Sequence, residues 1–154
     1  MECRDVMRSI ETRLYADEPA AKAIDFMART HMGLVPVVDR EDRFVGLVSG
    51  DRLMHLMLPH AVTMMRGEKR IGYLRESRAE LRERLDAVRG RTIADVMEQR
   101  VETVRPETGL VEAMLLMSNR QYVVPVVDAD GALAGAISFF SVLKALGLDG
   151  EDRS

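Results

Sequence analysis

Two similar stretches decide the fold of this chain: VPVVDREDRFVGLVS at residues 35–49 and VPVVDADGALAGAIS at residues 124–138. Each begins with a Val-rich run that ends in Asp, passes through turn residues, and ends in a second apolar run that contains Gly and finishes in Ser. Short β-branched and apolar runs bounded by turn residues are typical of strands. Each stretch is therefore predicted to form a β-hairpin, with REDR as the turn in the first copy and ADG in the second.

The repetition extends outward from the hairpins. DVM at residues 5–7 returns at 95–97, and AIDFM at 23–27 returns as AMLLM at 113–117. These two blocks recur after 90 residues, whereas the hairpins recur after 89, so the second copy has lost one residue between Met117 and Pro125. A loop is expected there. Several blocks that recur in one order indicate an internal duplication, which fixes the architecture.

Helices are predicted on both sides of each hairpin. The preceding segments, LYADEPAAKAIDFMART and VRPETGLVEAMLLMSNR, open with turn residues and then place apolar side chains at helical spacing. The following segments, DRLMHLML and FSVLKALG, are predicted short helices with Ser49 and Ser138 at their N-caps. With a strand before the first helix, the unit is strand–helix–strand–strand–helix, used twice in an α/β fold. The spaced apolar residues are Ala23, Ile24 and Met27, and then Ala113, Leu116 and Met117.

An insert at residues 59–91 separates the copies. Its second half, YLRESRAELRERLDAVRGR, is predicted to be helical, and Glu80 and Arg84 are spaced to support the helix as an i, i+4 pair. The favoured interpretation is a solvated helix that covers one edge of the fold; the alternatives are a dimerisation or partner-docking helix and, least favoured, a nucleic-acid contact. One face of this helix carries the apolar residues Leu74, Leu81, Leu85 and Val88.

The duplicated pattern resembles the CBS-domain family over residues 3–58 and 92–148, through DVM, the helix that follows it, PVVD, and Gly-apolar-apolar-Ser before the last helix. The resemblance implies a tandem pair of CBS repeats, or Bateman module, packed about a pseudo-twofold axis. The expected domains are repeat 1 at 1–58, the helical insert at 59–91, repeat 2 at 92–148 and a tail at 149–154.

The same resemblance implies a function. CBS pairs are non-catalytic regulatory modules that bind adenosine-type nucleotides in the clefts between repeats and commonly associate into flat dimers. We therefore expect a homodimer that senses AMP, ADP, ATP or a related adenosyl ligand and regulates a partner protein that the sequence does not identify. The alternative is a ligand-free dimerisation or scaffold protein with degenerate nucleotide sites.

The family's nucleotide motif is Gly-apolar-apolar-Ser/Thr, any two residues, then Asp. A helix N-terminus offers free N–H groups to a phosphate, and the Asp accepts from the ribose hydroxyls. Both copies depart from this motif: Ser49 is followed by Gly50, Asp51 and Arg52, which places the Asp one residue early. Asp51 is interpreted either as an acid that stabilises its own helix N-terminus or as a ligand contact, and Arg52 is a candidate phosphate contact.

The second copy follows Ser138 with two Phe residues and then Ser141, so it offers a hydroxyl where the family has a carboxylate. By resemblance, the adenine would pack on Thr12, Leu34, Val35 and Pro36 in one site and on Thr103, Tyr122, Val123, Val124 and Pro125 in the other. Packing in the core is the simpler interpretation of the valines. It is also favoured for Tyr122, although such a ring can stack on a base.

Other classes of function are poorly supported. The net charge of −3 argues against nucleic-acid binding. The single cysteine, Cys3, allows no intrachain disulfide, no membrane span is evident, and the N-terminus does not resemble a signal peptide, so we expect a cytoplasmic protein. His31, His55 and His60 lack the spacing of metal ligands, and no nucleophile elbow, P-loop or dinucleotide-binding fingerprint is present. We expect no enzyme activity, no metal and no cofactor other than a regulatory nucleotide.

Overall fold

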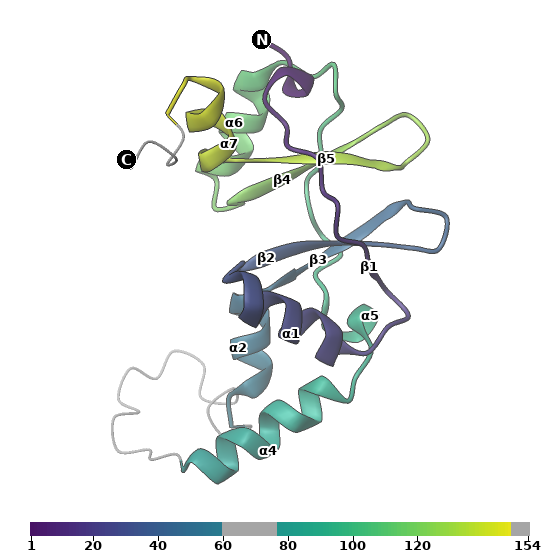
Figure 1. Ribbon diagram of the computed structural model, residues 1–154, viewed down its shortest axis with the longest axis vertical. Helices are drawn as coiled ribbons and strands as arrows, with labels where there is room; N and C mark the ends of the chain where they lie inside the picture. Colours follow the sequence, from purple (N-terminus) through teal and green to yellow (C-terminus); the bar gives the residue numbers. More distant parts are fainter. Residues whose placement is uncertain (60–76, 149–154) are drawn as a thin grey trace. The chain divides into compact units, whose positions relative to one another are not determined.

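The computed structural model describes residues 1–59 and 77–148 (Figure 1). Both predicted hairpins, the helices on either side of them and the helix in the insert are confirmed. In the first repeat the elements are η1 Cys3–Asp5, β1 Leu14–Tyr15, α1 Ala20–Thr30, β2 Leu34–Val38, β3 Phe44–Ser49 and α2 Gly50–Met57. The insert contributes α4 Arg78–Arg89, and the second repeat contributes α5 Ile93–Val96, α6 Leu110–Ser118, β4 Val123–Val127, β5 Leu133–Ser138 and α7 Phe139–Ala145.

The strands form two small sheets, one of order β1-β2-β3 and one of β4 with β5. The β4–β5 hairpin is antiparallel, with Val123 opposite Ser138 and a bulge between Val126 and Val127. The strand predicted before α6 is shortened to Val104, which bridges Val126 in parallel. Pro106 follows two residues later and has no backbone N–H to extend the ladder.

The residues cluster into two compact units that do not coincide with the sequence repeats. Unit 1 contains the described residues of Met1–Arg13, Val38–Gly46 and Gln99–Ser154, and unit 2 those of Leu14–Val37 and Leu47–Glu98. Each repeat therefore contributes its first residues to the unit that is built mainly from the other repeat.

Two backbone pairings hold these exchanged segments. In unit 1, Arg8 and Ala136 exchange two N–H···O bonds of 3.0 Å each. In unit 2, Leu47 and Glu98 exchange bonds of 2.9 and 2.7 Å. The two pairs occupy equivalent positions of the duplication, because Glu98 follows Arg8 by 90 residues and Ala136 follows Leu47 by 89. The second hairpin strand of each repeat is thus paired with a segment of the other.

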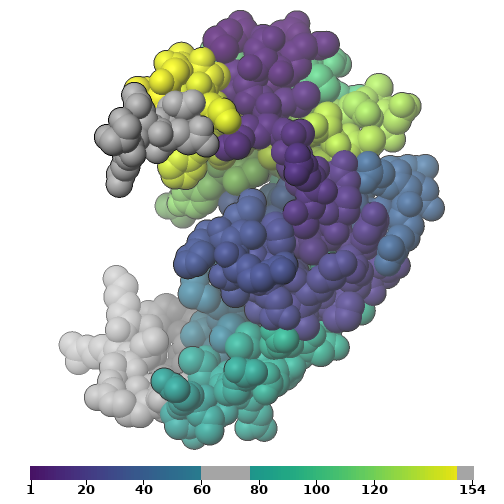
Figure 2. All heavy atoms as spheres, viewed as in Figure 1, coloured from purple at the N-terminus to yellow at the C-terminus, as the bar shows by residue number. Residues whose placement is uncertain are grey.

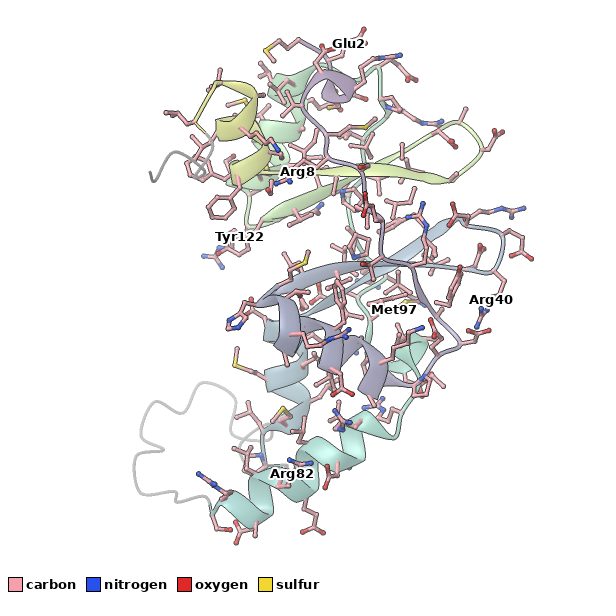
Figure 3. All side chains as sticks on the ribbon, in the orientation of Figure 1. Glu2, Arg8, Arg40, Arg82, Met97 and Tyr122 are labelled. Carbon is pink, nitrogen blue, oxygen red and sulfur yellow. The ribbon has the colours of Figure 1, made fainter. Side chains whose placement is uncertain are left out.

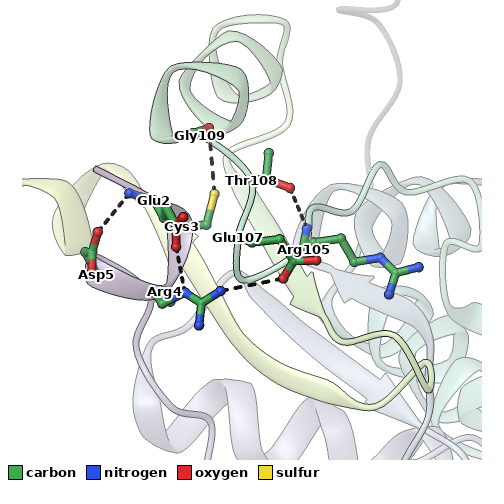
Figure 4. Close-up of polar contacts among 8 residues, drawn as sticks. All are labelled: Glu2, Cys3, Arg4, Asp5, Arg105, Glu107, Thr108 and Gly109. Carbon is green, nitrogen blue, oxygen red and sulfur yellow. Dashed lines mark hydrogen bonds and ion pairs between the residues drawn. The ribbon is translucent and has the colours of Figure 1, made fainter.

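The N-terminal turn is held against the loop that precedes α6 (Figure 4). The Cys3 N–H donates to the Thr108 carbonyl at 2.8 Å, and the Arg4 N–H donates to that of Pro106 at 2.9 Å. Cys3 is fully buried, and this burial raises the pKa of its thiol. It belongs to a core cluster with Val6, Val104, Ala113, Val124, Val126 and Ile137, against which Leu116 and Met117 of α6 and Val142 of α7 pack.

In unit 2 the insert helix α4 packs against α1 and α2, and the space-filling view shows its teal surface lying against α1 (Figure 2). Val88 is buried and Arg89 forms an ion pair with Asp25 of α1. Of the other residues of the predicted apolar stripe, Leu81 is 43% exposed and Leu85 is partly buried, and Leu74 lies outside the described residues. The expectation that this helix covers an edge of the fold is confirmed for α1 and α2.

Replacing Gly135 with Ala should destabilise the protein by about 1–3 kcal/mol, the usual cost of overpacking. A Cβ at this position would lie 2.7 Å from the Arg8 carbonyl oxygen, which is fixed by its pairing with Ala136. Urea unfolding measures the effect. Gly33→Ala is the matched control, because its Cβ would meet nothing within 4 Å. Equal stability of the two variants would contradict the close approach of the N-terminal segment to β5.

Candidate functional site

The first candidate site lies where β3 runs into α2. Ser49 is buried and its Oγ accepts a 3.1 Å bond from the Arg52 N–H, so the predicted N-cap is confirmed. The Gly50 N–H donates to the Gly33 carbonyl at 2.8 Å, which ties the start of α2 to the residue before β2. Leu34, a predicted site residue, follows directly and is only partly buried. Ser49, Gly50 and Leu34 are therefore brought together at one end of the β2–β3 hairpin.

The two charged residues of this site differ in their surroundings. Asp51 is exposed in the first turn of α2, where a carboxylate is favoured by the helix dipole. Arg52 is partly buried, and its Nε donates to the Val96 carbonyl at the end of α5 over 3.2 Å. Within the described part of the chain the guanidinium forms no other hydrogen bond, so its two terminal nitrogens can still donate to an anion.

The second candidate site, where β5 runs into α7, is closed by its own serines. The Ser138 Oγ accepts from the Ser141 N–H at 3.4 Å, and the Ser141 Oγ accepts from the Ser138 N–H at 2.6 Å. The Ser141 hydroxyl also donates to the Ser138 carbonyl at 2.8 Å, and Ser141 is 2% exposed. This reciprocal capping box uses the hydroxyl that was predicted to contact a ligand.

The predicted adenine-packing residues divide by burial. Val35, Pro36, Val124 and Pro125 are buried, so the core interpretation is confirmed for Val35 and Val124. The Pro125 carbonyl is also occupied, since it accepts from the Val104 N–H at 3.0 Å. These side chains have no surface to offer a ligand.

The prediction that Tyr122 packs in the core is wrong. Tyr122 is 67% exposed and lies next to the start of β4 (Figure 3). The neighbouring Gln121 takes the structural role instead: its amide accepts from the Glu102 N–H at 3.1 Å and donates to the Glu102 carbonyl at 2.7 Å. No sequence pattern indicated this role of Gln121, because a single Gln before a strand has no characteristic spacing.

The remaining site residues are also placed by the two units. Thr103 is exposed beside Val104 in unit 1, and Thr12 lies partly buried in unit 1, whereas Leu34 belongs to unit 2. Because Val123 pairs with Ser138, Tyr122 and Phe139 lie at the same end of the β4–β5 hairpin. Three exposed rings therefore gather at this end of unit 1: Tyr122, Phe139 at 62% and Phe140 at 73%, with the two phenylalanine rings edge-to-face at 6.0 Å.

The described residues contain no group of three or more His, Cys, Asp or Glu side chains arranged to hold a metal ion. Within residues 1–59 and 77–148, no helix has the length and apolar character that a bilayer-spanning segment needs.

The sequence profile of the CBS domain matches residues 3–59 and 93–148. The chain belongs to the CBS-domain family. No curated protein matches this CBS pair by sequence. Among solved structures it is similar to a CBS-domain protein of unknown function from Bacillus anthracis, at 17% identity and TM-score 0.73 over 96% of this chain and 93% of that one.

Three further solved structures share the fold of this CBS pair. The CBS-pair protein CBSX2 from Arabidopsis thaliana is 23% identical with a TM-score of 0.73, covering 94% of this chain and 93% of that one. The structure of CBSX2 in complex with AMP has 24% identity and a TM-score of 0.68, over 94% and 95%. CbpB in complex with c-di-AMP is 17% identical with a TM-score of 0.66, over 96% and 85%.

The two CBS repeats thus carry chemically different helix starts. The first presents an exposed carboxylate and a guanidinium with free donors, whereas the second presents two exposed phenylalanines and a serine pair that satisfies itself. The first is suited to a ligand with hydroxyl and phosphate groups, and the second to apolar contact alone.

Ser141→Ala should lower the free energy of unfolding by about 1 kcal/mol, the typical cost of losing a helix cap. The reason is that the capping box loses both bonds made by the Ser141 hydroxyl. Denaturant unfolding monitored by circular dichroism measures the loss. Ser118→Ala is the matched control, because Ser118 is exposed at the end of α6 and should change stability by less than about 0.5 kcal/mol. An unaltered midpoint for Ser141→Ala would contradict a structural role for this hydroxyl.

Proposed function

We propose that this CBS pair is a non-catalytic regulatory module that binds an adenine nucleotide, such as AMP, ADP or ATP, at the start of α2 in the first repeat. The single observation that carries the proposal is that, within the described residues, the terminal nitrogens of Arg52 form no hydrogen bond, next to an exposed Asp51 at a Ser-capped helix start. Two proteins of the same fold were solved in complex with AMP and with c-di-AMP, which supports a ligand of this class.

Each group has a defined role in the proposed complex. The Arg52 guanidinium donates charge-assisted bonds to the phosphate, and the Asp51 carboxylate accepts from the ribose hydroxyls. Leu34, which is partly exposed beside them, offers an apolar surface to the base. In this proposal the first repeat contacts the phosphate, the ribose and the base, although Asp51 stands one residue earlier than the family's motif places it.

A signal can arise because Arg52 already has a structural partner. Its Nε holds the Val96 carbonyl, two residues before Glu98, which pairs with Leu47 and ends unit 2. A phosphate that draws the guanidinium away competes with this bond. Nucleotide binding is therefore coupled to the segment through which the chain leaves unit 2. The two states are the protein with the Arg52–Val96 bond and the protein without it, and the nucleotide shifts their equilibrium by its different affinity for each.

We also propose that the protein is a homodimer, because large apolar side chains are exposed on its helices and such patches commonly mark association surfaces. The self-satisfied serine pair of the second repeat favours a second candidate function, in which the chain is a dimerising scaffold that binds no nucleotide.

Adenine nucleotide should raise the melting temperature. A ligand that binds only the folded state stabilises it by about 2.7 kcal/mol at a hundredfold excess over Kd. About 1 kcal/mol moves the melting temperature of a domain of this size by roughly 2–4 °C. We therefore expect a shift of several degrees with at least one of AMP, ADP and ATP, measured by differential scanning fluorimetry. No shift with any of them at millimolar concentration would contradict the sensor and favour the scaffold.

Arg52→Ala should reduce this shift, because the phosphate loses a charge-assisted contact. Each variant is compared with its own ligand-free protein, so that the effect of the substitution on the stability of the free protein is removed from the comparison. Arg82→Ala removes the same charge from the exposed face of α4 and is the matched control, expected to keep the full shift. An equal reduction in both variants would assign the effect to net charge and not to Arg52.

A further inference from the structure

The insert helix α4 is held against both helices of the first repeat. Its Arg84 Nε donates to the Met57 carbonyl at the end of α2 over 2.8 Å, and Val88 is buried. Arg89 forms an ion pair with Asp25 of α1 and donates hydrogen bonds to both oxygens of that carboxylate. These bonds lower the pKa of Asp25. Together the contacts fix α4 in one docked position on α1 and α2.

A single residue, Arg91, joins the end of α4 to the start of α1. Its N–H donates to the Val88 carbonyl in the last turn of α4 at 3.1 Å. Its carbonyl accepts from the Ala20 N–H, the first of α1, at 2.7 Å. The first N–H groups of a helix have no partner inside the helix, and the side chain of the N-cap residue Pro19 accepts no hydrogen bond. Arg91 therefore closes α4 and caps α1 at the same time.

The chain then passes into α5, the short helix whose last carbonyl accepts from Arg52. The N–H groups of Ile93 and Ala94 donate to carbonyls of the turn before α1 at 2.8 and 2.9 Å, which fastens α5 to that turn. Ile93 and Val96 are fully buried. Val96 accepts the 3.2 Å bond from the Arg52 Nε. An unbroken series of contacts therefore runs from α4 through Arg91 and α5 to the guanidinium at the start of α2.

The second repeat has the same fastening without the link to its helix start. The Leu110 N–H, the first of α6, donates to the Met1 carbonyl at 3.0 Å, which is the counterpart of the cap on α1. The position of Arg52 is taken by Ser141, whose hydroxyl is bonded to the backbone of Ser138 as donor and as acceptor. Among the described residues, the connection between a helix start and the preceding segment is therefore a feature of the first repeat.

We propose that α4 is an autoinhibitory element of the nucleotide site. While α4 is docked, it holds the Val96 carbonyl where it occupies the Arg52 guanidinium, and nucleotide binding favours the release of α4. The inference rests on the nucleotide site proposed above, in which the bound state lacks the Arg52–Val96 bond. Because coupling between two equilibria is reciprocal, undocking of α4 raises the affinity for the nucleotide by the factor by which the nucleotide favours undocking. The insert thus reports the bound nucleotide and limits its affinity.

Two variants that break the docking ion pair from opposite sides test this coupling. Arg89→Ala and Asp25→Ala both remove the contact between α4 and α1, but they change the net charge in opposite directions. Each is titrated separately with AMP, ADP and ATP by isothermal calorimetry. Both should bind nucleotide about two- to fivefold more tightly than wild type, which is the range that an ion pair of this exposure can supply.

Arg82→Ala is the matched control for the titrations. It removes the same charge as Arg89→Ala from the same helix, but Arg82 is paired with Asp86 inside α4 and makes no docking contact with α1. Its nucleotide affinity should equal that of wild type. Circular dichroism melts establish that the three variants are folded.

Hydrogen exchange of the wild-type protein measures the docking of α4 directly. Saturation with nucleotide should speed the exchange of the amides of residues 78–89 and leave those of α6 unchanged, because α6 belongs to the other unit. A wild-type protein that binds none of the three nucleotides would overturn the nucleotide site and this inference with it. Unchanged or weaker affinity in Arg89→Ala or Asp25→Ala, or unchanged or slower exchange in α4, would overturn the autoinhibition and leave the nucleotide site standing.

Discussion

Reciprocal backbone pairing between the two repeats is the constraint on which the rest of the structure depends. Arg8 pairs with Ala136 in β5 of the second repeat, and Glu98 pairs with Leu47 in β3 of the first. Two backbone hydrogen bonds join each pair. An unpaired hairpin edge leaves backbone donors and acceptors unsatisfied, so each repeat needs the segment that the other provides. A repeat of this size would also be marginal alone, because small chains bury too little of their surface. The duplication therefore gives two interdependent units and not two independent domains.

The candidate nucleotide site is connected to this constraint in one repeat only. Arg52 donates to the carbonyl of Val96, two residues before the exchanged Glu98, so the ligand that we propose at the start of α2 would act on the crossing segment directly. At the equivalent position the second repeat has Ser141, whose hydroxyl is consumed by its own helix cap. The two repeats thus share one architecture, but the residues at the starts of α2 and α7 differ in chemistry.

The features that the sequence predicted correctly are local ones. The hairpins, the Ser49 and Ser138 caps and the insert helix follow from turn residues, β-branched runs and helical spacing. The features that it missed depend on distant partners. Gln121, next to the exposed Tyr122, bonds to Glu102, 19 residues away, and Arg52 donates to a carbonyl 44 residues along the chain. The exchange of segments was also hidden, because each repeat is continuous in sequence and nothing local indicates which hairpin its first residues will join.

We propose that the first repeat binds a nucleotide and that the second does not. The number of AMP molecules bound per chain, measured by isothermal titration calorimetry with the wild-type protein, tests it most directly. We predict one site per chain, because among the described helix starts after the hairpins only that of the first repeat offers a carboxylate and uncommitted guanidinium donors. Two sites per chain would show that the serine pair and phenylalanines of the second repeat do not exclude the ligand and would contradict the claim.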